Sequence, residues 1–186
     1  MQLPPGITEQ ELVRQCKNGD LKHQEMLYKH FYGYAMGVGL RYSANRDDAL
    51  EVVNDAFIKA FGDIENYRTD KPFKAWLRKI VVNTAIDKYR RDKKHLMNVE
   101  LDNAVHIGSQ ASILQQLNAN DILKMLDTLP PAYRMVFNLY EIDGYDHNEI
   151  AAMMGISASS SRVYLARAKE KLRSMLQEDK EHERRV

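Results

Sequence analysis

The sequence has one cysteine, Cys16, and only 9 glycines and 5 prolines among its 186 residues. A single thiol can form neither an intramolecular disulfide nor a thiolate zinc site, and it fits a reducing compartment. Few glycines and prolines mean few obligatory turns, which favours helices. Neither sign of charge dominates, because 27 basic residues nearly balance 26 acidic ones. The distribution of charge along the chain is therefore more informative than its sum.

Long hydrophobic runs are also missing. The longest uncharged apolar stretch is residues 31–40, about half of the roughly 20 residues that a membrane-spanning helix needs. Residues 1–11 lack the basic start and apolar run of a signal peptide. We expect a cytoplasmic protein without membrane insertion.

Patterns typical of enzymes are absent as well. The sequence has no phosphate-binding loop, no Gly-x-Ser-x-Gly elbow and no His-Glu-x-x-His zinc motif. Its 6 histidines are scattered, and none pairs with another at ligand spacing. We expect no catalytic residue, no cofactor, no metal site and no small-molecule substrate.

Apolar residues recur at helical spacing almost throughout, and no alternating strand pattern appears. The sequence predicts an all-α protein of two small helical domains joined by a flexible linker. The predicted ranges are 1–20 for an N-terminal helix that leads into or belongs to the first domain, 21–94 for the first domain, 95–120 for the linker, 121–177 for the second domain and 178–186 for a charged, frayed tail.

Helix starts are predicted at Thr8, at Asn45 or Asp47, and at Pro72, since these residue types favour the first turn. One helix is expected over about 21–42. The helix that begins at Pro72 is expected to reach about residue 91.

Residues 146–172 predict a helix-turn-helix. Asp146 and Glu149 have the spacing of a capping box, Gly155 suits a left-handed helix end, and Ser157 can cap the next helix. The second helix is expected to bury a stripe made of Ser161, Leu165, Ala168 and Leu172. Its opposite side carries small residues and arginines, which suit a DNA major groove. The alternative is a helical hairpin whose second helix is basic and solvated.

Charge is segregated in the first half of the chain. Residues 71–94 carry nine Lys or Arg against two acids, and residues 47–65 carry six acids and one lysine. Clustered cations are typical of phosphate contacts. An acidic helix face would be repelled by DNA, so we expect it to contact protein. The alternative is that the two segments neutralise each other within the domain. Trp76 shares a helical face with Phe73 and is expected in the core.

In this order, these elements resemble the extracytoplasmic-function (group 4) sigma factors of the sigma-70 family. Residues 48–57 (DALEVVNDAF) are similar to that family's region 2.2. Residues 73–83 (FKAWLRKIVVN) match its pattern Phe-x-x-Trp-Leu-x-x-Ile-x-x-Asn, and residues 129–137 (LPPAYRMVF) are similar to the opening of region 4. The resemblance covers nearly the whole chain apart from the linker and the two ends.

The resemblance implies a sigma factor that directs core RNA polymerase to promoters and initiates transcription. Polymerase would bind through Asp48, Glu51, Asp55 and Phe57. The residues expected to bind the −10 element, together with the loop 66–71, are Lys71, Lys74, Arg78, Lys79, Asn83, Arg90 and Arg91, with Asn83 making a polar contact. The residues expected to bind the −35 element are Ser159, Ser160, Arg162, Val163, Ala166, Arg167 and Lys169. The linker would thread the RNA exit path, and an anti-sigma factor is a hypothetical further partner.

The chain departs from the family at two places. Ser159-Ser160-Ser161 stands where the family usually has Gly-Thr-Val, and polar Ser161 is expected to weaken the buried stripe. Leu50 and Asn54 replace the usual Glu and Gln of the acidic helix. Two other classes stay open. A stand-alone dimeric helix-turn-helix regulator would bind duplex DNA without polymerase, and a helical adaptor would explain the acidic helix but neither basic one.

Overall fold

The computed structural model describes residues 7–68, 70–98 and 119–183, and these form helices and connecting turns without a strand. The all-α prediction is therefore confirmed. The chain divides into two compact units, residues 1–88 and 89–186, and each is described by itself. Across the described ranges, every helix is too short or too polar to cross a bilayer.

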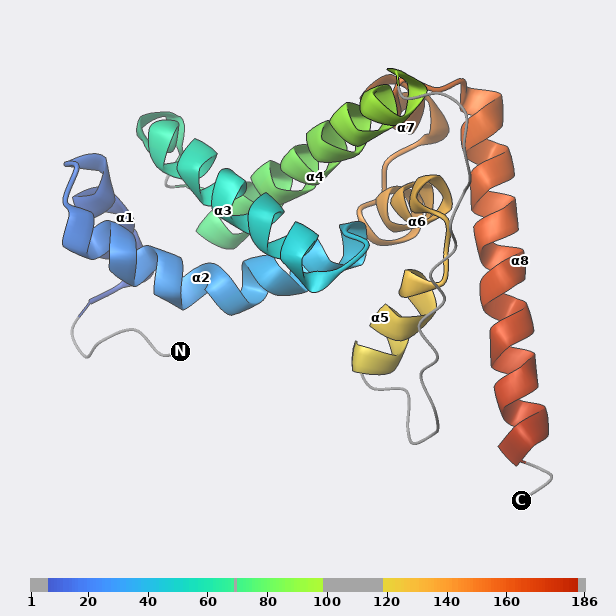
Figure 1. Cartoon of the computed structure of the whole chain (residues 1–186). Helices are drawn as coiled ribbons and strands as arrows, with labels where there is room; N and C mark the ends of the chain where they lie inside the picture. Colours follow the sequence, from blue (N-terminus) through green and yellow to red (C-terminus); the bar gives the residue numbers. More distant parts are fainter. Residues whose placement is uncertain (1–6, 69, 99–118, 184–186) are drawn as a thin grey trace. The chain divides into compact units, whose positions relative to one another are not determined.

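The first unit is a bundle of long helices (Figure 1). Its elements are α1 (Glu9–Lys17), α2 (Leu21–Tyr42), α3 (Arg46–Gly62), the 3-10 turn η1 (Ile64–Asn66) and the first part of α4 (Phe73–Asn98). The Thr8 and Asn45 side chains accept hydrogen bonds from the backbones of Glu11 and Asp48, as expected for caps. α4 begins directly after Pro72. The helix predicted over 21–42 has these bounds in the structure.

Aromatic and β-branched side chains fill the core of the first unit. The Phe31 and Phe73 rings lie 4.9 Å apart and join α2 to α4. α2 and α3 approach closely at Gly39, where a Cβ would lie 3.2 Å from Val53 Cγ2 and 3.3 Å from the Ala49 carbonyl oxygen. The main buried residues are Leu12, Val13, Leu27, Ala35, Val38, Val52, Val53, Ala56, Phe57, Leu77, Val81 and Val82.

The second unit is built from shorter helices packed on one long one. Its elements after α4 are α5 (Ala119–Asp127), α6 (Pro131–Phe137), a π-helical turn η2 (Asn138–Ile142), α7 (His147–Met154) and α8 (Ala158–Glu183). Leu126, Leu129 and Ala168 form a buried cluster that Tyr133, Phe137 and Leu172 extend. The buried Arg134 guanidinium lies 2.7 Å from Asp127, which joins α6 to α5.

Three helices extend beyond the ends that the sequence pattern indicates. α4 continues to Asn98 and α5 begins at Ala119, so residues 95–98 and 119–120 are helical rather than linker. α8 continues to Glu183, so residues 178–183 of the predicted tail are part of this helix. Both helix ends are rich in Lys, Arg, Glu and Gln and lack Gly and Pro, so helix propensity carries them on without apolar periodicity. Residues 99–118, which hold the rest of the predicted linker, and residues 184–186 lie outside the described range.

Candidate nucleic-acid and polymerase interfaces

The helix-turn-helix of the second unit has the predicted caps. Asp146 accepts hydrogen bonds from the backbones of Asn148 and Glu149, and the Glu149 side chain accepts one from the Asp146 backbone, which completes a capping box. Gly155 ends α7 in the left-handed region, with φ 64° and ψ 44°. Ser157 Oγ accepts from the Ser160 backbone at the start of α8. The turn is therefore fixed by side chains that the sequence alone identifies.

α8 has one buried and one exposed side. Ser161, Leu165 and Ala168 are buried and Leu172 is half-buried, which confirms the predicted stripe. The opposite side exposes Ser159, Arg162, Val163, Ala166 and Arg167, and Val163 at its centre is 45% exposed. This exposed side has no bulky apolar residue, so a base edge could approach it closely.

The buried hydroxyl of Ser161 has a hydrogen-bond partner. The hydroxyl lies 2.9 Å from His147 Nδ1, across the helix-turn-helix from α8 to α7. The His147 ring stacks on Tyr140 of η2, with 4.6 Å between the ring centres. A hydrogen bond thus replaces the apolar contact that the family's usual valine would make at this position.

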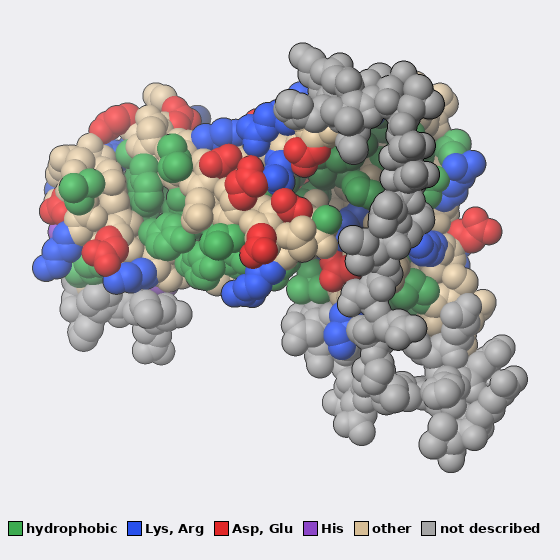
Figure 2. Space-filling view, viewed as in Figure 1, with side chains coloured by type: hydrophobic (Ala, Val, Ile, Leu, Met, Phe, Trp, Pro, Cys, Tyr) green, Lys and Arg blue, Asp and Glu red, His purple; other side chains and the backbone are tan. Residues whose placement is uncertain are grey.

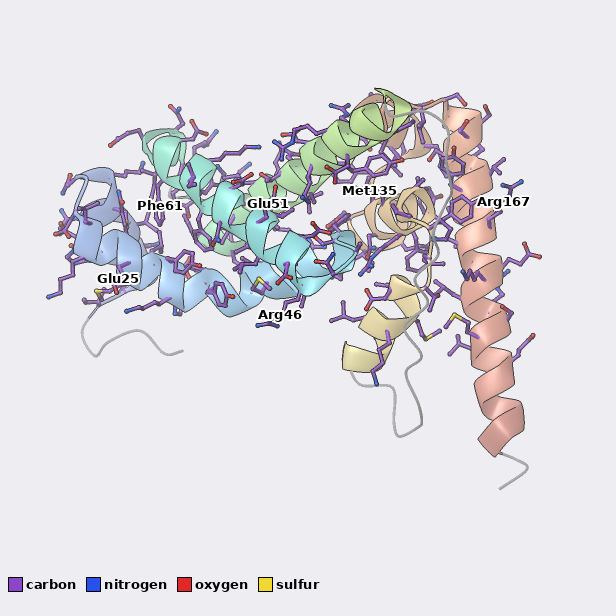
Figure 3. All side chains as sticks on the ribbon, in the orientation of Figure 1. Glu25, Arg46, Glu51, Phe61, Met135 and Arg167 are labelled. Carbon is purple, nitrogen blue, oxygen red and sulfur yellow. The ribbon has the colours of Figure 1, made fainter. Side chains whose placement is uncertain are left out.

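Two of the expected −35 residues are held within the unit. Arg167 projects from α8 (Figure 3), and its Nη1 donates to the Tyr133 hydroxyl of α6 at 2.9 Å. Lys169 is half-buried on the flank of α8, with Nζ 2.6 Å from Glu141 of η2. Ser160 is half-buried beside the cap. Arg162, Val163 and Ala166 are exposed on α8 and are not among these held residues.

In the first unit, the −10 residues predicted on α4 fall on two faces. Lys79 and Asn83 are one turn apart and exposed on the same face. Lys74 and Arg78 lie on another face, where Lys74 Nζ sits 4.5 Å from the centre of the Tyr34 ring of α2. Tyr34 is an aromatic neighbour of this cluster that the sequence did not identify, because its contact with α4 depends on the helix packing.

The remaining −10 candidates lie before this helix and on its later part. Lys71 is exposed in the loop before α4. Arg90 and Arg91 are exposed on the part of α4 that belongs to the second unit, where Arg90 Nη2 donates to the Ala152 carbonyl of α7 at 2.7 Å. Trp76 is half-buried rather than in the core, and its ring centre lies 5.1 Å from that of Tyr67 and 5.4 Å from that of Phe73. The prediction of a core tryptophan is wrong, because Trp76 covers the buried rings of Tyr67 and Phe73 from the edge of the core.

The acidic face of α3 is engaged by a lysine of α4. Glu51 lies on α3 next to α4 (Figure 3), and its carboxylate is 2.6 Å from Lys88 Nζ. Asp48 is 3.2 Å from the same Nζ. A second pair joins Lys59 of α3 to Asp87 of α4 at 3.1 Å. At these residues, acids and lysines of α3 and α4 neutralise each other within the first unit, as the alternative interpretation of the charge pattern expected.

The Phe57 side chain lies on the buried side of α3 rather than on its exposed surface. It is 2% exposed, and its ring centre lies 4.7 Å from that of Tyr28 and 5.9 Å from that of Phe61. A partner cannot touch it in this conformation, so the prediction that Phe57 makes a direct polymerase contact does not agree with its burial.

A different surface of α3 is open. We define the α3 stripe as Leu50, Asn54, Ile58 and Phe61, which share one face by their spacing. Ile58 is 70% exposed and Leu50 is 37% exposed. Tyr28 of α2 adjoins the stripe and donates to Asn54 Oδ1 at 3.1 Å. Figure 2 shows hydrophobic side chains gathered over α2 and α3, with acidic ones among them. The helical spacing of Leu50, Ile58 and Phe61 was the sequence signal for this surface.

Within the described ranges, no cluster of three or more His, Cys, Asp or Glu side chains could hold a metal ion. Cys16 is buried, and burial together with Asp20 raises the pKa of its thiol to about 11. The first unit thus carries a helix with cationic residues and the partly apolar α3 stripe, and the second unit carries a helix-turn-helix.

Two family matches cover both units. Residues 27–95 match the family described as Sigma-70 region 2, and residues 119–172 match Sigma-70, region 4. The chain belongs to the sigma-70 family. It is a promoter-recognising sigma factor, and the stand-alone dimeric regulator is not favoured. Sigma factors are not catalytic enzymes.

Relatives place this sigma factor in the extracytoplasmic-function group. It is 29% identical to the ECF RNA polymerase sigma-E factor of Escherichia coli over 183 residues, which covers 92% of this chain and 95% of that protein. It is 26% identical to the Haemophilus influenzae protein of the same name, with 92% and 96% covered. Its fold is similar to that of the sigma factor RpoE from Bartonella quintana, solved in complex with the anti-sigma factor NepR. That match has a TM-score of 0.51, 21% identity, and coverage of 84% of this chain and 98% of that one.

Proposed function

We propose that this sigma factor works in the cytoplasm and divides promoter recognition between its two units, α8 binding the −35 element and α4 with its preceding loop binding the −10 element. Core RNA polymerase docks on the first unit, on the surface formed by α2 and α3. The observation that carries the proposal is the helix-turn-helix, whose second helix buries one side and exposes a side of small residues and arginines.

The −35 contact is supported by the shape of the exposed side of α8. Arg162 can make the bidentate hydrogen bonds that recognise guanine, and Val163 and Ala166 can contact thymine methyl groups. Arg167 is oriented by Tyr133, and Ser159 and Ser160 lie at the helix start, where phosphates bind. Lys169 acts at the edge of this surface after exchanging its pair with Glu141 for a phosphate.

The −10 contact is supported by the exposed polar and basic residues of α4. Asn83 and Lys79 share one face, with the half-buried Trp76 near it. A base that leaves the DNA stack costs a few kcal/mol, which stacking and hydrogen bonds must recover. Trp76 and Asn83 can supply such contacts. Lys71, Lys74, Arg78, Arg90 and Arg91 can supply phosphate contacts.

For polymerase, the α3 stripe is the central contact and the acids lie at its edge. Exposed apolar and aromatic residues dominate protein interfaces, while pairs at the rim contribute less. Asp48 and Glu51 already pair with Lys88, so their attraction for a cationic partner is reduced. Phe57 supports the stripe from below. An anti-sigma factor would bind one of these surfaces in competition with core polymerase or promoter DNA.

The proposal is tested by binding measurements with core RNA polymerase and fragments of a randomised DNA pool. We expect the chain alone to be a monomer that shifts no duplex fragment, and a one-to-one complex with core polymerase that selects fragments with two spaced elements. If the chain alone binds duplex DNA as a dimer and core polymerase adds nothing, the proposal is wrong and the regulator class takes its place.

A further inference from the structure

Lys17, the last residue of α1, is directed into the first unit rather than to solvent. Its Nζ donates to the Tyr67 carbonyl at 2.9 Å and to the Glu65 carbonyl at 3.2 Å. The same Nζ lies 5.9 Å from the centre of the Tyr67 ring. These contacts reach across 48 and 50 residues of sequence, to the segment that leads from η1 into α4.

The position of α1 brings this lysine to the loop. Leu12, Val13 and Cys16 bury one side of α1, which packs against α2 and η1. Burial of that side turns the last residue toward the carbonyl groups of Glu65 and Tyr67. α1 precedes residues 27–95, which match region 2, so the contact joins an element outside the matched range to one within it.

Other contacts complete the support of the loop. Tyr67 is buried, and its hydroxyl donates to the Lys71 carbonyl. Burial raises the pKa of the Tyr67 hydroxyl, and the charges of Glu9 and Asp70 act in the same direction, so the hydroxyl stays a donor at neutral pH. Lys71 N–H donates to the Arg68 carbonyl at 3.2 Å, which closes a turn. Arg68 and Lys71 are exposed, and the Arg68 guanidinium pairs with Asp70 at 2.9 Å.

We propose that Lys17 is a positioning residue for recognition of the −10 element. Its ammonium holds the Glu65 and Tyr67 carbonyls, and the Tyr67 hydroxyl holds the Lys71 carbonyl. These contacts position Arg68 and Lys71 for unstacked DNA. The inference rests on the proposed function of the first unit. A preformed contact surface discriminates between bases better than a mobile one, because small displacements weaken short-range hydrogen bonds. Removing the ammonium therefore lowers selectivity rather than general DNA affinity.

The test uses the full chain in complex with core RNA polymerase. Lys17→Met keeps the length of the side chain but has no donor, and Lys17→Arg keeps the charge and donors. Lys22→Met is the matched control, since Lys22 is an exposed lysine at the start of α2. The fragment that the wild-type complex selects best from a randomised pool is transcribed beside variants with one base changed in either element. Transcript ratios give the discrimination at each element, and thermal melting of the free chain gives its stability.

Lys17→Met is expected to lower discrimination at the −10 element about tenfold, which corresponds to about 1.4 kcal/mol. Discrimination at the −35 element stays as in the wild type, Lys17→Arg restores most of the −10 loss, and Lys22→Met changes neither. The inference is overturned if Lys17→Met keeps full −10 discrimination, or if it reduces both elements alike together with the melting temperature. Absence of −10 discrimination by the wild-type complex would instead contradict the proposed function itself.

Discussion

Phe57 and Ile58 are consecutive residues of α3 in opposite environments, so their replacement separates folding from docking. Phe57 is 2% exposed and packs on Tyr28 and Phe61, whereas Ile58 is 70% exposed. Truncating a buried phenylalanine to alanine costs about 3–5 kcal/mol. Domain stabilities are only about 5–15 kcal/mol. Phe57→Ala should therefore lower the melting temperature of the first unit by more than ~10 °C.

Ile58→Ala should leave the fold intact and weaken polymerase binding. Its side chain loses little buried surface in the free chain, so the free energy of unfolding should change by less than ~0.5 kcal/mol. At the centre of an interface, the same truncation costs more than about 1 kcal/mol, or at least roughly fivefold in affinity. Leu21→Ala is the control, because Leu21 is an exposed leucine at the start of α2, outside the α3 stripe.

The assay combines denaturant unfolding, followed by circular dichroism, with titration of labelled chain by core RNA polymerase. Equal polymerase affinity for Ile58→Ala, Leu21→Ala and the wild type would refute the α3 stripe as the docking surface. A stable Phe57→Ala variant with weakened polymerase binding would refute the assignment of Phe57 to the core.

Three further predictions concern separate parts of the molecule. Gly37→Ala should stabilise the chain by about 0.5–1 kcal/mol through helix propensity, because its Cβ would meet open space. Gly39→Ala should destabilise the chain, because its Cβ would press against Val53 and the Ala49 carbonyl. Equal melting temperatures for the two variants would contradict this prediction. The Cys16 thiol, with a pKa raised from 9.0 to about 11, should react slowly with iodoacetamide at pH 8 unless denatured, and its contribution to stability should be present below pH 9 and be lost as the pH rises toward 11. Arg162→Ala should lower discrimination at the −35 element about 10- to 100-fold without changing polymerase affinity, and a uniform loss over all DNA sequences would show that Arg162 contacts only phosphate.

Local sequence signals predicted much of the fold because the responsible contacts are local. Caps at Thr8, Asn45 and Asp146 bond to residues within three positions, and Gly155 needs only its own backbone conformation. The family resemblance added the order of the two units. The ends of α4 and α8 were missed because helix propensity without apolar periodicity resembles a polar linker.

The site was predicted less completely, because it depends on contacts between helices. Lys88 lies between Asp48 and Glu51 only after α3 packs on α4, and nothing in its sequence spacing indicates this. The burial of Phe57, the contact of Tyr34 with Lys74 and that of Lys17 with the loop have the same origin. Residue type and periodicity identify a face, but they do not determine which other helix covers it.

Transcription by core RNA polymerase with and without the purified chain tests the central claim most directly. On fragments selected from a randomised DNA pool, we predict transcripts with one start site only when the chain is present, lost when Arg162 and Ile58 are both replaced by alanine. Transcription that the chain does not change, on any selected fragment, would contradict the account.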